Sequence, residues 1–176
     1  VEVARFPDVR TARIVENSLY LAVLILWVPH FLALYRALRE TSLAPALFGS
    51  VLSILGLVVL AAESLHHIWQ TPISDLYHAP GATIEAQATL VLLWRTTHGI
   101  AHMLLVTGLI FLPIGIIALG MAMFKAPAFG KGFGGLSVVL GVAGLVAAFV
   151  LLVDRGSMVA VVCVFALIIF HLILGW

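Results

Sequence analysis

The residues best suited to chemistry in this sequence are seven polar side chains set in strongly apolar surroundings. They form two groups along the chain: Glu63, His66, His67 and Gln70, followed by Arg95, His98 and His102. Hydrophobic residues make up 63% of the chain and charged residues only 10%. Ionisable groups at membrane depth are costly, and as a rule they face a bundle interior, a cavity or a cofactor. We therefore expect any functional site to lie among these residues.

The spacing within each group places its members on one face of a helix. Residues 63, 66, 67 and 70 follow the pattern i, i+3, i+4, i+7, and residues 95, 98 and 102 follow i, i+3, i+7. The polar connection 71–82 joins the two helices, so both faces are expected at the same end of a helix bundle and at similar depth.

A metal site is one chemistry that this pattern predicts. His98 and His102 lie one helical turn apart, and Glu63 and His66 have the Glu-x-x-His spacing of carboxylate-bridged di-iron bundles. Only one such Glu-x-x-His helix is present, which favours a mononuclear Zn or Cu site over a di-iron site, with Fe as a further alternative. The candidate ligands are Glu63, His66, His98 and His102.

A tetrapyrrole is a second interpretation. Haem held between two helices takes one axial His from each, which His66 or His67 and His98 or His102 could supply. A chlorophyll-type pigment would need a single axial His, and Trp69 and Trp94 flank the region.

A third interpretation is structural. Glu63 would form an ion pair with Arg95, and the histidines would hydrogen-bond within the bundle or extend toward the membrane surface. This explains the charges without chemistry, but it leaves the surplus of histidines at one end unexplained.

Composition narrows the class of protein. A mean hydropathy of +1.20 excludes an ordinary soluble domain, and a formal charge of +1 excludes a strongly basic nucleic-acid binder. Cys163 is the only cysteine, so the chain forms no internal disulfide. No complete catalytic motif is present, and we expect no enzymatic activity.

The elements that must position these residues are membrane-spanning helices. We predict an all-α, polytopic transmembrane bundle that forms one domain over residues 1–176. Its five spans are expected at about 13–38, 43–70, 83–124, 133–153 and 157–176. The third is about twice as long as a bilayer's hydrocarbon core requires, so it should project from the membrane or bend. His30 and His171, toward the opposite end, are expected to be packing residues.

Small residues on the predicted fourth helix indicate close helix packing. Gly130, Gly134, Ser137 and Gly141 fit small-xxx-small spacing. Packing inside the bundle is one interpretation, and a face for a membrane protein partner or a homo-oligomer is the other.

The loops predict an orientation in the bilayer. The segments 36–42 and 125–132 are short and mainly basic, which places them in the cytoplasm. The 71–82 connection and the histidine cluster would then lie on the extracytoplasmic side of a bacterial inner membrane. Val1 is not a Met and Trp176 lies in an apolar run, so we expect both ends to be cut. The region before the first span lacks the charged, apolar and cleavage-site pattern of a removable signal peptide, so we expect the first span to be a signal anchor.

Short motifs resemble a bacterial family of small polytopic membrane proteins described only as a domain of unknown function. They are Ala61-Ala62-Glu63-Ser64, Leu112-Pro113-Ile114-Gly115, and Ala126–Gly130 leading into Gly134–Ser137. The resemblance implies a bundle of five or six helices with no assigned activity. The family usually has a Pro-Arg-aromatic run where this chain has Pro127-Ala128-Phe129, and the histidine cluster is not a feature of it.

Two functions follow as expectations. The first is a non-catalytic accessory or structural subunit that packs in a larger membrane complex. The alternative is a redox or electron-transfer membrane protein that binds haem, a chlorophyll-type pigment or a Cu, Zn or Fe ion through the His/Glu cluster.

Overall fold

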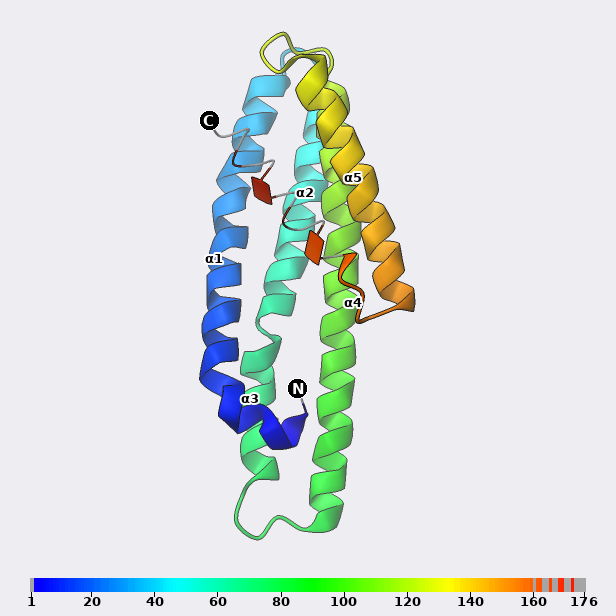
Figure 1. Ribbon diagram of the computed structural model, residues 1–176. Coiled ribbons are helices and arrows are strands. Elements are labelled where there is room, and N and C mark those ends of the chain that lie inside the picture. Colours follow the sequence, from blue (N-terminus) through cyan, green and yellow to red (C-terminus); the bar gives the residue numbers. More distant parts are fainter. Residues whose placement is uncertain (1, 160, 163–164, 166–167, 170–171, 173–176) are drawn as a thin grey trace.

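The computed structural model describes residues 2–159, 161–162, 165, 168–169 and 172, and the elements assigned in them are all helical. In chain order they are η1 (Val3–Arg5), α1 (Phe6–Leu38), α2 (Leu43–Ser64), α3 (His66–Tyr77), α4 (Ile84–Met123) and α5 (Gly130–Val153). The long helices run up and down along one direction, with α2 and α4 in the middle of the bundle (Figure 1). The predicted all-α bundle is confirmed.

Four stretches in this part of the chain are long and apolar enough to cross a membrane. They are Val3–Leu38, Leu43–Tyr77, Ile84–Met123 and Gly130–Val153. Five spans were predicted, and four are found in the described residues. The predicted fifth span, at 157–176, falls largely outside the described residues. The predicted bend in the third span is not confirmed, since α4 is one helix of 40 residues, about 60 Å long at 1.5 Å per residue.

The first helix begins earlier than the sequence indicated. Phe6 rather than Arg13 is its first residue, and Pro7 lies in the first turn. Proline is tolerated there because the first backbone N–H groups of a helix have no internal partner. The polar lead-in is therefore helical, and η1 and the start of α1 reach across the lower end of the bundle (Figure 1).

The second predicted helix, 43–70, is two helices. α2 ends at Ser64, and α3 runs from His66 through Pro72 to Tyr77, so the predicted end of this span at residue 70 is wrong. The helix is interrupted at Leu65, whose backbone N–H donates a hydrogen bond to the carbonyl of Glu63. The interruption thus falls within the predicted polar face, between Glu63 and His66.

Small residues let α2 and α4 approach closely. A Cβ atom added to Gly115 of α4 would lie 2.6 Å from the backbone nitrogen of Ser53, and one added to Gly56 of α2 would lie 2.7 Å from that of Leu112. Both distances are shorter than side chains allow, so glycine is required for this backbone contact.

Small residues also let α5 pack closely against α4. Gly134, Ser137 and Gly141 are buried, and added Cβ atoms at Gly134 and Gly141 would meet the carbonyls of Gly120 and Pro113, each at 2.9 Å. This small-residue face therefore packs within the chain. Gly130 differs from the others because it begins α5 with φ +67° and faces open space. A partner subunit at this face stays a prediction.

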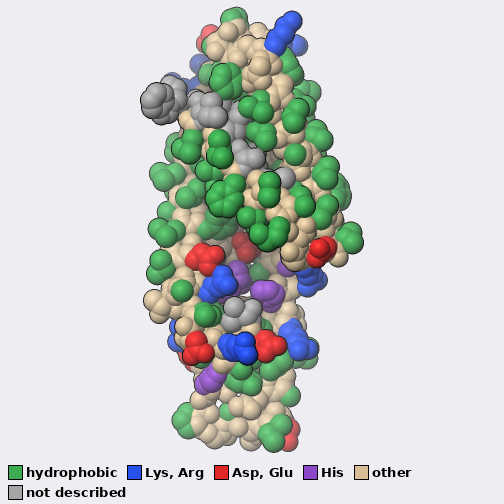
Figure 2. Space-filling model, viewed as in Figure 1, with side chains coloured by type: hydrophobic (Ala, Val, Ile, Leu, Met, Phe, Trp, Pro, Cys, Tyr) green, Lys and Arg blue, Asp and Glu red, His purple; other side chains and the backbone are tan. Residues whose placement is uncertain are grey.

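Charged and histidine side chains gather in a band across the lower part of the view in Figure 2, below a broad hydrophobic surface. Large apolar side chains such as Leu26, Val58, Val139 and Phe149 are more than half exposed, as expected for helices that face lipid. The band lies at the end of the bundle where the chain begins, and where the predicted histidine cluster belongs.

Candidate functional site

The break between α2 and α3 fixes the position of His66. Its Nδ1 atom lies 2.9 Å from the backbone carbonyl of Glu63 and 3.3 Å from the carboxylate Oε1 of the same residue. Both side chains are nearly buried, with relative exposures of 10% for His66 and 12% for Glu63. An Nδ1–H donor satisfies these oxygens and leaves Nε2 as the ring nitrogen open to another partner.

A hydrogen-bond chain positions His67 and joins α3 to α4. His67 Nδ1 lies 3.3 Å from Gln70 Oε1, and Gln70 Nε2 donates to Thr97 Oγ1 at 3.4 Å. Thr97 donates in turn to the carbonyl of Trp94 at 2.9 Å. Gln70 is fully buried, so this polar connection is shielded from solvent. The oxygen and nitrogen of Gln70 are assigned from this network.

The imidazoles of α3 and α4 meet at the helix interface. The ring centroids of His66 and His67 are 3.8 Å apart, and those of His66 and His98 are 5.9 Å apart with their planes at 68°. His102 lies one turn further along α4, and its Nε2 is buried without a hydrogen-bond partner in the part of the chain that the structure describes. The structure therefore brings His66, His67 and His98 together as the sequence predicted.

The predicted metal set is not assembled. Among the described residues, no group of three or more His, Cys, Asp or Glu side chains is arranged to hold a metal ion. A protein site for Zn usually has at least three protein ligands. Glu63, His66, His98 and His102 therefore do not form the four-ligand site that the spacing indicated.

The expected ion pair also differs. Within the described residues Glu63 pairs with His66, and the Glu63–Arg95 ion pair is not formed. His66 follows Glu63 by three residues across the interruption at Leu65, while Arg95 lines a surface pocket.

The N-terminal residues cover this cluster. Phe6 is fully buried and lies 5.1 Å from Trp94 and 5.8 Å from His67, measured between ring centroids. An ion pair between Arg10 and Asp75 joins α1 to α3 close by. A small second core of Val3, Phe6, Ile73 and Trp94 thus forms beneath the histidines.

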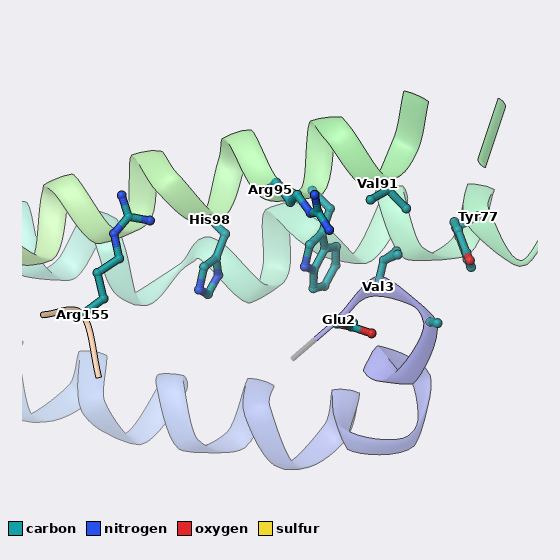
Figure 3. A pocket seen from close by; sticks show the side chains of 9 residues that line it. Glu2, Val3, Tyr77, Val91, Arg95, His98 and Arg155 are labelled. Carbon is teal, nitrogen blue, oxygen red and sulfur yellow. The ribbon is translucent and has the colours of Figure 1, made fainter. Parts of the chain in front are cut away.

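A pocket of about 520 Å³ opens beside the cluster. Its wall comes from η1, α3, α4 and the turn after α5, and it comprises Glu2, Val3, Ala4, Tyr77, Val91, Trp94, Arg95, His98 and Arg155. Figure 3 shows Arg155 and Arg95 on either side of His98 along α4. His98 therefore contacts both the internal histidines and the open pocket.

No family model, curated protein or solved structure matches this chain. The resemblance to a family of small polytopic membrane proteins accordingly stays a prediction.

Sequence reasoning missed the residues of η1 and the start of α1. Glu2, Val3 and Phe6 precede the first apolar run, and the helical pattern in that run gives no sign that the chain turns back across the bundle. The aromatic residue Phe6, just before Pro7, was the one available signal, because aromatic side chains bury a large apolar area when they pack in a core.

Proposed function

We propose that this chain is an integral membrane protein, a non-catalytic subunit of a larger membrane assembly, that binds a cofactor at the polar end of its bundle. Four long apolar helices support the membrane location. The observation that carries the cofactor role is the meeting of His66 and His98, from two different helices, with ring centroids 5.9 Å apart.

The environment of His66 resembles that of a ligand histidine. Metal-binding histidines almost always donate their second ring N–H to a carboxylate or a backbone carbonyl, which fixes the tautomer and raises the basicity of the ligand nitrogen. His66 has both kinds of acceptor, the carbonyl and the carboxylate of Glu63. His67 has an amide oxygen in the same role.

The number of available ligands favours haem over a bare metal ion. Haem is held by one or two axial ligands from the protein, whereas a tightly bound Zn ion needs three or four. Two imidazoles from facing helices meet the first requirement, and the described residues offer no group of three for the second. Electron transfer within the membrane assembly is the function that such a cofactor would serve.

Absorption spectroscopy with metal analysis tests the cofactor. We expect protein purified in mild detergent to show a Soret band and stoichiometric iron, and both to fall in His98→Ala. Colourless, metal-free protein would refute the cofactor role. Alkaline carbonate extraction tests the membrane location separately, because an integral protein stays in the pellet whether or not it binds haem.

A purely structural subunit is the second candidate. It is favoured by the internal hydrogen bonds of His66 and His67, which satisfy one nitrogen of each ring without any ligand. Under this proposal the purified protein is colourless, and His66→Ala lowers its thermal stability. Co-purification with membrane partners is expected under both candidates.

The proposed orientation places the polar end on the extracytoplasmic side of a bacterial inner membrane. Basic residues at the opposite end support it: Arg36, Arg39, Lys125 and Lys131. Single cysteines at Ala79 and Thr41, introduced with Cys163→Ser, test this in whole cells. An impermeant thiol reagent should label position 79 and leave position 41 unlabelled; the reverse pattern would invert the orientation.

A further inference from the structure

The pocket beside the histidines contains more positive than negative charge. Arg95 and Arg155 line it together with His98, and Glu2 supplies one carboxylate. In the described part of the chain, neither guanidinium forms an ion pair or a hydrogen bond. Two arginines without an acidic partner in one pocket favour an anionic ligand, because guanidinium groups bind phosphate or carboxylate through paired N–H donors.

The level of the pocket along the bundle identifies the source of the anion. α5 has 24 residues and a length of about 36 Å, enough to cross the hydrocarbon core of a bilayer. Arg155 lies in the turn directly after α5, where Asp154 Oδ1 accepts a hydrogen bond from the N–H of Gly156. A turn that follows a membrane span lies at the headgroup layer, and Arg155 brings the pocket to that depth.

The remaining lining matches a lipid at the same depth. Trp94 and Tyr77 are residue types that concentrate at membrane interfaces, and Val3 and Val91 add apolar surface beside the cations. Arg95 and His98 lie one turn apart on α4, with Arg155 approaching from another element (Figure 3). A phosphodiester in this pocket would therefore meet positive charge from two elements that are far apart in sequence.

We propose that this pocket binds the phosphate of an anionic membrane lipid, with Arg95 and Arg155 supplying positive charge from its wall. The lipid would join the turn after α5 to α4 and so stabilise the polar end of the bundle. The proposal rests on the membrane location given above and is independent of the cofactor, since it uses His98 only as part of the pocket wall.

Native mass spectrometry of the whole protein tests this, with phosphatidylglycerol and phosphatidylcholine offered in equal amounts. We expect preferential retention of phosphatidylglycerol, and about fivefold weaker binding for Arg95→Gln or Arg155→Gln, as each basic residue near a membrane surface contributes about that factor. Arg39→Gln is the matched control, because it removes one exposed arginine from the opposite end. It should bind phosphatidylglycerol as the parent protein does.

Three results would overturn the proposal. One is equal retention of the two lipids, and another is the same loss of binding in Arg39→Gln as in Arg95→Gln and Arg155→Gln. The third concerns the thermal stability of the protein. If inorganic phosphate without lipid raises the unfolding temperature as much as phosphatidylglycerol does, the ligand is a soluble anion. Carbonate extraction and the Soret band are measured on the same preparations, so failure of the membrane location or of the cofactor is seen separately.

Discussion

The imidazole of His66 contacts Glu63 twice, through the backbone carbonyl at 2.9 Å and through the carboxylate at 3.3 Å. Both contacts use Nδ1, and both lie at the interruption at Leu65, between the end of α2 and the start of α3. The ring held by these contacts also faces His98 on the neighbouring helix.

A double-mutant cycle should detect coupling between these two side chains. Glu63→Ala, His66→Ala and the double variant are unfolded in detergent, and the coupling free energy is taken from the three changes in stability. We expect about 0.5–1.5 kcal/mol, because both groups are nearly buried and each single substitution leaves the other without its side-chain partner. Strictly additive effects would show that the carboxylate contact contributes nothing and that the backbone carbonyl alone holds the ring.

Two glycines of α4 should respond in opposite ways to alanine. Gly115→Ala places a methyl group 2.5 Å from the carbonyl of Gly49, so α2 and α4 must move apart, at a cost of about 1–3 kcal/mol. A Cβ atom added at Gly99 has no neighbouring atom within 4 Å, so Gly99→Ala should be neutral or raise stability by up to about 1 kcal/mol, as alanine favours the helix. Thermal unfolding in detergent measures both. Equal destabilisation would contradict the close packing of α2 on α4.

The sequence was sufficient to predict the helices that depend on apolar length. The span Ile84–Met123 follows from the apolar run that begins after Thr83, whose side chain accepts a hydrogen bond from the N–H of Ala86 and caps the helix. The turn after Val153 follows from its Asp-Arg-Gly-Ser sequence. In both places local chemistry and hydropathy indicate the same boundary, so no tertiary information is needed.

The site was predicted only in part, because its details depend on tertiary contacts. Helical spacing placed His66 and His98 at one depth, and the structure brings them into contact. The interruption of the helix at Leu65 has no proline or glycine to mark it, and Glu63 has His66 as its partner in place of the predicted Arg95. The packing of Phe6 on Trp94 also depends on the N-terminal segment crossing the end of the bundle, which the hydropathy pattern does not predict.

Phe6→Ala should destabilise the polar end of the bundle. The ring is fully buried between Trp94 and His67, so its removal leaves a cavity and should cost about 3 kcal/mol. Phe149→Ala is the control, since that ring is 58% exposed on the apolar surface. Hydrogen exchange should show faster exchange in residues 66–77 for Phe6→Ala and no change there for Phe149→Ala. Unchanged exchange in both variants would mean that the N-terminal residues do not cover the cluster.

The cofactor proposal predicts different effects of substituting two histidines, His78 and His98, that the sequence places at the same end of the bundle. His78 has Nδ1 2.8 Å from the carbonyl of Ser74 and Nε2 3.3 Å from that of Ala4, so both of its ring nitrogens face backbone oxygens. His98 instead faces His66 and the pocket. We therefore expect His98→Ala to abolish the Soret band and His78→Ala to retain it.

A further substitution, Glu63→Ala, removes the side chain that orients His66 without removing a haem ligand. Loss of such a supporting contact typically lowers affinity by about tenfold or more, so the haem content after washing should fall while the band position is retained. Haem titration of the stripped protein measures the change, with Glu85→Ala as control, since Glu85 lies exposed in the first turn of α4. If Glu63→Ala binds haem as tightly as the control, the carboxylate does not support the ligand, and the backbone carbonyl of Glu63 is sufficient to orient the ring.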